Sequence, residues 1–473
     1  MKKKVKIIAT IGPSSATPEV IHKLLTEGTN IFRINFSHET QKSASAVILH
    51  IRQQAGKIGL EPAILVDLQG PKIRTGPTRE NKTFTIQEGT LVRITPEEIE
   101  SDDKAIFIRY PGLSAKIKKN SHILINDGAI RLRVEQIEKS GSIYCTALST
   151  GAYSSFKGAN FPGLDLGIPS LTAKDLNDLN FILDKDIQYI ALSFVRGPED
   201  LQDLREITIK KRNDLKIIAK IEKPEAAEKI SDILQVCDGI MVARGDLGVE
   251  TTPYSVPVIQ KELIDKANSA GKLVIVATQM LESMIRSRIP TRAESTDVAN
   301  AIIDGTDAIM LSGETAVGLY PVESVQTMIQ IATITENSHY IHEKNADLII
   351  KDCYPPHAIC EAAAHASFDM GKIPICVFTV SGDTALYLSK IKPQAPIYAF
   401  SPEMQTVRML SMAWNVTPFF LRFATDIPGL LRDAEGVLLN AGLVKKNDLL
   451  ALVSGTTPVK GATNSLQIKR VGA

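Results

Sequence analysis

Two charged residues, Lys220 and Glu222, stand where the apolar run KIIAKI (216–221) ends. Residues two apart in a strand share a face, so both side chains point the same way while the apolar residues between them point toward covering helices. As a purely structural pair, they would cost desolvation energy without an obvious net gain. A lysine and a carboxylate in this position therefore favour chemistry on a charged substrate.

A second carboxylate follows the next apolar run, where the sequence RGDLG places Asp246 between Gly245 and Gly248. Glycines let backbone amides approach a bound anion, and the carboxylate can reach a metal ion. Glu222 and Asp246 would form a partial oxygen shell of the kind that holds Mg²⁺ or Mn²⁺, with water and a substrate phosphate completing it. Zinc is not expected, because no His or Cys is near in the sequence.

Hydroxyl and guanidinium groups follow other apolar runs. Thr278 comes after LVIVA and Ser312 after AIML. A hydroxyl there either caps a helix or, beside a metal and a lysine, orders a water molecule. Arg33 in RINFSH and Arg74 in DLQGPKIRTG suit bidentate binding of phosphate. His38, taken singly, is more often a structural residue than a catalyst.

These residues require a scaffold that gathers the ends of many strands. Eight apolar runs alternate with helical patterns, which predicts an α/β fold with a parallel sheet covered on both faces. Eight such units indicate a (β/α)8 TIM barrel, whose chemistry lies at the C-terminal ends of its strands. The runs cover residues 5–9, 30–35, 63–67, 187–193, 216–221, 239–243, 273–277 and 308–311.

Two further regions depart from this pattern. Residues 71–167 carry short alternating runs separated by turns, which predicts a small antiparallel β domain, a β-barrel inserted at the active-site end as a lid. The catalytic barrel would then comprise residues 1–70 and 168–345, with a last helix from Pro321 to about residue 345. Residues 346–473 predict a smaller α/β domain with a mixed sheet.

Composition excludes several classes of function. The net charge of +1 gives no general attraction to nucleic acid or to a membrane surface. The five cysteines lack disulfide or zinc spacing, which fits a reducing cytoplasm. No apolar segment approaches the roughly 20 residues that span a bilayer. There is no P-loop and no protein-kinase motif, so any nucleotide must bind to the barrel.

The motifs as an ordered series resemble those of pyruvate kinases: ATIGPSS, RINFSH, DLQGPKIRTG, KGANFPG, IAKIEKPEA, MVARGDLGVE, ATQMLESM and DGTDAIMLSGETAVGLYP. The resemblance covers residues 5 to about 345, and the C-terminal region is similar to the regulatory domain of that family. It implies transfer of the phosphoryl group of phosphoenolpyruvate to ADP, giving pyruvate and ATP in the last step of glycolysis. It also implies a homotetramer.

The resemblance assigns roles to the barrel residues. Lys220 would face the transferring phosphoryl group, and Glu222 and Asp246 would bind the essential divalent ion. Thr278, with Ser312 nearby, would help water to protonate the enolate. Arg33 joins these catalytic residues as the ligand of the substrate phosphate. The implied substrate-binding residues are Arg33, Ser193, Lys220, Gly245, Asp246 and Thr278.

Two further groups are implied near the hinge of the lid. The nucleotide phosphates would meet Arg74, Lys157, His38 and Asn35. A potassium ion in many relatives lies near positions that match Asn35, Ser37, Asp67 and Leu68. Those relatives carry Glu where this chain has Lys72, whose ammonium could replace the ion. We therefore expect activity without potassium.

The C-terminal domain offers an effector site. Thr379, Ser381, Gly382 and Thr384 lie at a predicted helix start, where amides and hydroxyls can hold a phosphate. A second glycine-rich loop carries Lys460. The resemblance implies allosteric activation by a sugar phosphate or a nucleotide monophosphate. Asp383 makes the turn less favourable for an anion, and a plain strand–helix turn is the alternative.

Two other functions are compatible with such a barrel. A lyase or aldolase acting on phosphoenolpyruvate or pyruvate also holds a metal with Glu and Asp, but it needs no nucleotide lid and no Lys157. A metabolite-sensing pseudo-enzyme would signal through the C-terminal domain. The intact set of Lys220, Glu222, Asp246 and Thr278 argues against the second alternative.

Overall fold

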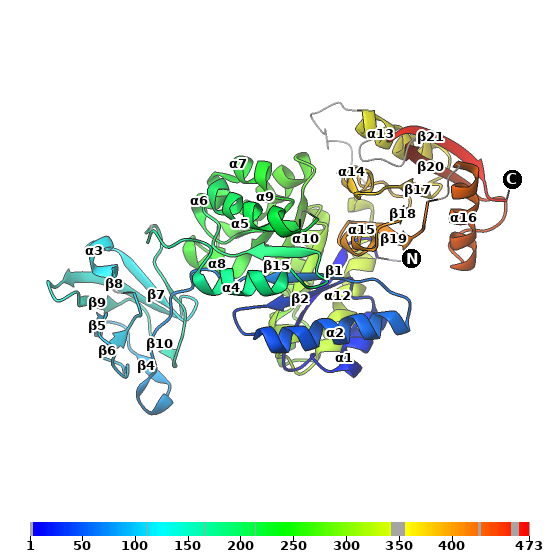
Figure 1. Ribbon diagram of the computed structural model, residues 1–473. Helices are drawn as coiled ribbons and strands as arrows, with labels where there is room; N and C mark the ends of the chain where they lie inside the picture. Colours follow the sequence, from blue (N-terminus) through cyan, green and yellow to red (C-terminus); the bar gives the residue numbers. More distant parts are fainter. Residues whose placement is uncertain are drawn as a thin grey trace.

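Three bodies follow one another along the molecule: a β domain, a central barrel and a C-terminal α/β domain (Figure 1). The structure is a computed structural model, and it describes residues 3–110, 112–164, 166–212, 214–341, 355–423, 427–455 and 463–472. No helix within these ranges is long and apolar enough to cross a membrane.

The central body is a closed barrel of eight parallel strands in the order β1-β16-β15-β14-β13-β12-β3-β2. The predicted (β/α)8 barrel is therefore confirmed. Its strands are β1 (Lys6–Ile11), β2 (Ile31–Asn35), β3 (Ala63–Asp67), β12 (Tyr189–Leu192), β13 (Lys216–Ile221), β14 (Gly239–Ala243), β15 (Leu273–Ala277) and β16 (Ala308–Leu311). Its helices are α1 (Pro18–Glu27), α2 (Gln41–Lys57), α4 (Ala173–Ile182), α5 (Pro198–Lys211), α6 (Pro224–Glu228), α7 (Ile230–Val236), α8 (Arg244–Glu250), α9 (Val256–Ser269), α10 (Arg292–Ile303), α11 (Gly313–Ala316) and α12 (Pro321–Glu336), with the short 3₁₀ turn η2 (Glu282–Ile285).

Alternation along β13 decides which residues reach the barrel interior. Ile217 and Ile221 pack into the cluster between the strands and the helices, whereas Ile218 packs with the apolar residues inside the barrel. Lys220 and Glu222 share the inward face with Ile218. The chain then turns outward, because Lys223 is extended and Pro224 occupies the first turn of α6.

The inserted domain holds its strands in two sheets. A six-stranded sheet has the order β11-β7-β8-β9-β5-β6, and β10 pairs with β4. The described residues thus form no single closed barrel here, and β5 and β6 pair in parallel, unlike the antiparallel expectation. The lid elements are β4 (Phe84–Ile86), β5 (Leu91–Thr95), β6 (Ala105–Phe107), α3 (Leu113–Lys116), β7 (His122–Ile125), β8 (Ile130–Ile137), β9 (Ile143–Ala147), β10 (Gly151–Tyr153) and β11 (Ala159–Asn160), after the turn η1 (Arg79–Asn81).

The C-terminal domain contains a mixed sheet in the order β19-β18-β17-β20-β21, with β21 antiparallel to β20, as predicted. The helix before it is shorter than expected. It ends at Glu336, because the Asn337 side chain binds the carbonyl of Thr333 and Ser338 binds that of Thr335. The remaining elements are η3 (His339–Ile341), α13 (Pro355–Asp369), β17 (Ile375–Phe378), α14 (Asp383–Ile391), β18 (Ile397–Ser401), α15 (Met404–Leu410), β19 (Val416–Phe420), α16 (Ile427–Asn440), β20 (Leu449–Gly455) and β21 (Thr463–Arg470).

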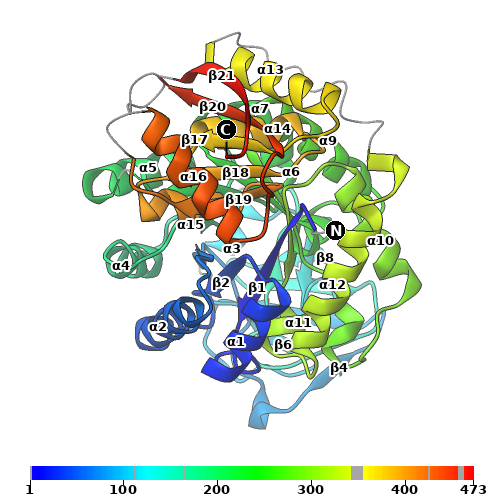
Figure 2. The ribbon, with the colours of Figure 1, turned by 90° about the vertical axis from the view of Figure 1, so that its right-hand side faces the viewer.

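The two smaller domains lie at opposite ends of the barrel (Figures 1 and 2). The inserted domain leaves the barrel after β3, at the C-terminal ends of the strands. The C-terminal domain contacts the other end, where Lys392 binds Asp307, the residue just before β16, at 2.7 Å. Tyr189 at the start of β12 donates to the carbonyl of Met409 at 2.7 Å. The C-terminal ends of the barrel strands therefore lie on the side of the inserted domain.

Candidate active site

A buried ammonium group lies at the centre of the candidate site. Lys220 Nζ lies 2.8 Å from Glu222 Oε1, 3.3 Å from Asp67 Oδ1 and 2.7 Å from Ser193 Oγ. Burial alone would lower the pKa of Lys220, but the charges of Asp67 and Glu222 outweigh burial and raise it above its usual range. Lys220 is thus a permanent positive charge and no proton acceptor at neutral pH.

Arg33 completes this charged cluster from β2. Its Nε and Nη2 donate to Asp67 Oδ2 at 2.8 and 2.6 Å, and its Nη1 donates to Thr10 Oγ1 at 3.1 Å. The charges of Lys220 and Arg33 hold the pKa of Asp67 below its usual range, although burial acts in the opposite direction. Asp67 therefore orients two catalytic candidates at once.

Glu222 and Asp246 bring negative charge to the same place. Glu222 Oε2 accepts a hydrogen bond from the Phe194 amide at 2.7 Å. Burial raises the pKa of Glu222, and the like charges of Asp246 and Asp67 raise it further against the effect of Lys220. Asp246, in the first turn of α8, has a carboxylate without a hydrogen bond to the described residues.

This pair of carboxylates fits a divalent cation. The charge of Asp246 disfavours the ionised form of Glu222, and a metal ion between the two carboxylates would favour it. Hard oxygen ligands suit Mg²⁺ or Mn²⁺, which commonly take one or two protein carboxylates. Among the described residues no group of three or more Asp, Glu, His or Cys side chains is arranged for a metal, so water and substrate would supply the other ligands.

Thr278 follows β15 in an unusual backbone conformation, with φ +67°. No helix starts there, since the next element is the turn η2, so the helix-cap interpretation of Thr278 is wrong. Its Oγ1 accepts a hydrogen bond from the Gly245 amide at 2.8 Å and donates to the Ala277 carbonyl at 2.6 Å. The hydroxyl therefore links the ends of β14 and β15.

Ser312 lies at the end of β16, next to this loop in the barrel order. Its amide donates to Glu314 Oε2 at 2.7 Å, and Glu314 Oε1 accepts from the Leu281 amide at 3.0 Å. The Ser312 Oγ is buried and has no partner among the described residues. A buried hydroxyl without a partner suits a water molecule or a ligand atom.

Several positively charged side chains surround His38 where the barrel joins the inserted domain. The pKa of His38 is lowered first by burial and then by the charges of Arg74, Lys72 and Arg33. A bridge between Arg74 and Gly158 joins the two hinge segments, which places Lys157 next to Arg74 along the return strand. Three of the four expected nucleotide residues thus meet at one hinge. The fourth, Asn35, accepts from the Ser37 amide at 3.0 Å.

The expected potassium region is only partly separate from the catalytic cluster. Asp67 already binds Arg33 and Lys220, and the Leu68 carbonyl accepts from Ser193 Oγ at 2.8 Å. Sequence reasoning placed Asp67 beside a monovalent ion and missed its contact with both cations. One signal for this contact was available in the spacing of the residues. Residues two apart in a strand share a face, and β2 and β3 pair Arg33 with Leu65 and Asn35 with Asp67.

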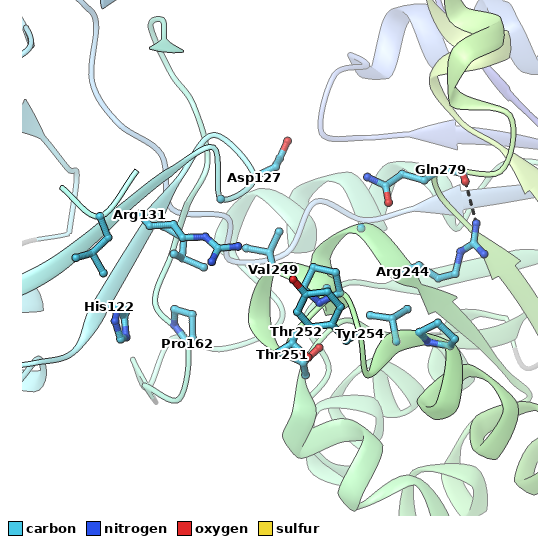
Figure 3. Close-up of a pocket in the computed structure, with 18 of the residues that line it drawn as sticks. His122, Asp127, Arg131, Pro162, Arg244, Val249, Thr251, Thr252, Tyr254 and Gln279 are labelled. Carbon is cyan, nitrogen blue, oxygen red and sulfur yellow. Dashed lines mark hydrogen bonds between the residues drawn. The ribbon is translucent and has the colours of Figure 1, made fainter. Parts of the chain in front are cut away.

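A cleft of about 660 Å³ separates the lid from the barrel. His122, Asp127 and Arg131 line it from the lid, and Gly245 and Gln279 line it from the barrel (Figure 3). Gly245 contacts Thr278, and Gln279 follows Thr278 in the chain. The cleft therefore gives solvent access to the candidate site. Sequence reasoning missed Gln279 and Arg244, because nothing in their spacing marks them.

The expected effector residues meet at the start of α14. Thr379 Oγ1 accepts from the Gly382 amide at 2.9 Å, and Ser381 Oγ donates to Asp383 Oδ2 at 2.9 Å. The Thr384 hydroxyl lies 2.7 Å from that of Thr463. Gly382 has φ +90°, which explains a glycine here. Lys460 lies outside the described residues.

Comparison with known proteins gives one consistent result. The family model "Pyruvate kinase, barrel domain" matches residues 2–325, and "Pyruvate kinase, alpha/beta domain" matches residues 357–469. Pyruvate kinases of Staphylococcus haemolyticus and Bacillus licheniformis are 40% and 41% identical over 99% of this chain and 81% of each relative. The crystal structure of a pyruvate kinase from Cryptosporidium parvum is 33% identical, with a TM-score of 0.90 over 99% of this chain and 96% of that chain. The chain belongs to the pyruvate kinase family.

Proposed function

We propose that the chain transfers the phosphoryl group of phosphoenolpyruvate to ADP, and that Lys220 stabilises the charge on the group in transfer. The observation that carries this proposal is the buried, protonated Lys220 between Asp67 and Glu222 at the strand ends. Phosphoryl transfer depends on positioning and on charge stabilisation more than on covalent help. A fixed ammonium group in a buried site supplies both.

Glu222 and Asp246 would hold Mg²⁺ or Mn²⁺, which neutralises phosphate charge and orients the substrate. The protein groups do the remaining work. Arg33, fixed by Asp67, binds the substrate phosphate. Backbone amides in the first turn of α8 bind the carboxylate of the substrate. Thr278 and the unpartnered Ser312 Oγ hold the water that protonates the enolate.

Residues 71–167 would act as the lid, with Arg74, Lys157, His38 and Asn35 binding the nucleotide phosphates. The surroundings of His38 support this, because the charges of Arg74, Lys72 and Arg33 lower its pKa in addition to the larger effect of burial. Such a group of cations attracts a polyanion. Closing the cleft would exclude water and bring the two phosphates together.

A coupled assay with lactate dehydrogenase tests the activity. Phosphoenolpyruvate, ADP and MgCl₂ together should give pyruvate and ATP, and omission of ADP or of the metal should abolish the product. The Lys157→Met variant should raise the KM for ADP more than that for phosphoenolpyruvate. Pyruvate formed equally well without ADP would indicate transfer of the phosphoryl group to water, and a native chain that forms no ATP would favour a lyase or a pseudo-enzyme.

The finer properties are also proposals. The chain would be a cytoplasmic homotetramer that a phosphorylated effector activates through Thr379, Ser381, Gly382 and Thr384. The close placement of these hydroxyls at one helix start supports the effector site, and Asp383 opposes it. Assays with a panel of sugar phosphates and nucleotide monophosphates, together with sedimentation velocity, test both points.

A further inference from the structure

We propose that Arg244 is a positioning residue that holds Thr278 in the geometry required for protonation of the enolate. This inference rests on the proposed role of Thr278. Arg244 is the first residue of α8, and its side chain is buried. It lies between the carboxylate-binding turn of α8 and the loop that follows β15. No motif in the sequence gives it this role.

The loop after β15 contains backbone strain. Thr278 and Gln279 have φ of +67° and +54°, and neither residue is glycine. A β-branched residue is especially disfavoured in the left-handed region. Each such residue costs of the order of 1–3 kcal/mol, and it persists only where the surroundings fix it. Some group must therefore hold this pair of residues in place.

Arg244 makes the contacts that fix them. Its Nη2 donates to the carbonyl of Thr278 at 2.8 Å and to that of Gln279 at 3.0 Å, and its Nε lies 3.2 Å from the Thr278 carbonyl. Figure 3 shows the Arg244 guanidinium directed at the Gln279 carbonyl, with a dashed line that marks their hydrogen bond. On its other edge, Nη1 donates to Asp297 Oδ1 at 2.7 Å. One planar group thus binds both strained carbonyls while an acid fixes its orientation.

Other side chains hold the loop further along, but not at the strained residues. Glu314 accepts from the Leu281 amide at 3.0 Å, and Glu294 accepts from the Ser283 amide at 2.7 Å. Both bind N–H groups beyond Gln279. Without Arg244, Thr278 and Gln279 are free to relax toward negative φ. That rotation moves the Thr278 hydroxyl away from the Gly245 amide and breaks the hydrogen bond between them.

The expected defect is specific to one step. Within the described part of the chain, the Arg244 side chain makes no hydrogen bond or ion pair with Lys220, Glu222 or Asp246, so the metal site should survive its replacement. Relaxation of the loop should slow proton transfer to the enolate about 5- to 150-fold, the range that 1–3 kcal/mol of lost positioning gives. If protonation of the enolate limits the overall rate, turnover falls together with the rate of proton transfer.

The test compares Arg244→Met with Arg205→Met. Arg205 also binds two backbone carbonyls and an aspartate, Asp238, but lies outside the candidate site. Exchange of the pyruvate methyl protons with deuterated water, in the presence of MgCl₂ and ATP, reports the protonation step by NMR. Mn²⁺ binding by electron paramagnetic resonance reports the metal site. We expect exchange to fall in Arg244→Met alone, with Mn²⁺ binding unchanged.

A second substitution separates positioning from loss of fold. Asparagine adopts the left-handed conformation more readily than glutamine. Adding Gln279→Asn to Arg244→Met should therefore recover part of the lost exchange. Unchanged exchange in Arg244→Met, or equal loss of exchange and Mn²⁺ binding without recovery, would overturn the inference. Failure of the native chain to make ATP from phosphoenolpyruvate would instead overturn the proposed function.

Discussion

The ammonium of Lys220 affects both the transferred group and the metal ligand beside it. Lys220→Met should lower turnover about 10²- to 10³-fold, because a buried charge opposite a developing anion is lost. Lys220 also opposes the rise in the pKa of Glu222. Its removal raises that pKa further, so Glu222 becomes protonated at a higher pH. On acidification, Mn²⁺ affinity should therefore begin to fall at a higher pH than in the native chain.

The neighbouring Lys223 provides the control. It lies 3.5 Å from Glu250 and faces away from the cluster, so Lys223→Met should keep both turnover and the pH profile of Mn²⁺ binding. Titration by electron paramagnetic resonance between pH 5 and 8 measures the profile. Near-normal turnover of Lys220→Met would show that the proposed role of the ammonium is wrong.

A second residue-scale prediction concerns Lys72. Its charge is one of three that lower the pKa of His38. Lys72→Glu replaces a cation of the hinge by an anion, so the pKa of His38 should rise and a monovalent cation should become necessary. NMR titration of His38 measures the first effect, and assays in tetramethylammonium buffer with and without KCl measure the second.

The matched control is Lys82→Glu, which changes an exposed lysine of the lid in the same way. The native chain and this control should keep their rates without potassium. A collapse of the native rate in that buffer would refute the idea that Lys72 replaces the ion.

How far the sequence could predict the site depends on the range of each contact. The convergence of Lys220 and Glu222 follows from local alternation along one strand, and it was predictable. The Arg33–Asp67 contact depends on the register of two strands 32 residues apart in β2 and β3. The strained conformation of Thr278 depends on the guanidinium of Arg244, which belongs to another element, α8. Neither feature can be predicted from a single stretch of sequence.

At the scale of elements, the loop between β15 and η2 is held by carboxylates as well as by Arg244. Glu314 accepts from the amides of Leu281 and Ser312, one with each oxygen. Glu314→Gln leaves one of these buried amides facing an NH₂ group. The loss should destabilise the fold by about 1–3 kcal/mol and should slow exchange of the pyruvate methyl protons.

Glu323→Gln is the comparison for this prediction. Glu323 pairs with Arg288 at 3.2 Å on the surface, where the side chain of Arg288 is 72% exposed. Such pairs contribute little, so its melting temperature should stay near the native one. Equal melting temperatures for the two variants would contradict a structural role of Glu314 in this loop.

Element boundaries were predictable where burial and turns agree. The runs 63–67, 216–221 and 239–243 coincide with β3, β13 and β14, since each strand is buried on both faces. The topology of the inserted domain was not predictable, because the consecutive strands β5 and β6 pair in parallel across a short connection, where a hairpin is usual. The end of α12 was missed, since Asn337 and Ser338 stop it through side-chain contacts.

At the scale of the molecule, the turn at the start of α14 and the cluster around Lys220 lie on opposite sides of the barrel. α14 starts at this turn with Asp383 and ends near Lys390, which reaches across the domain boundary to Asp307. Asp307 directly precedes β16, and Ser312 directly follows it. A single helix and a single strand thus join the two sites, which makes this contact the place to test coupling between domains.

Asp307 binds both Lys390 and Lys392, and all three residues are buried. Burial lowers the pKa of Lys390 to about 8, with the charge of Lys392 acting in the same direction. The unfolded chain, with an ordinary lysine pKa near 10.4, therefore binds more protons between about pH 8 and 10. Stability of the docked domains should rise with pH across this window, and Lys390→Met should remove that rise.

Replacement of Asp307 and replacement of Lys390 should have very different effects on the free energy of unfolding. Asp307→Asn leaves two buried ammonium groups without a counter-charge and should cost about 3–5 kcal/mol, whereas Lys390→Met keeps the Asp307–Lys392 pair and should be nearly neutral. Thermal unfolding at pH 7.5, 8.5 and 9.5 measures both effects. Equal destabilisation by the two substitutions would mean that Lys390 is essential to the pair.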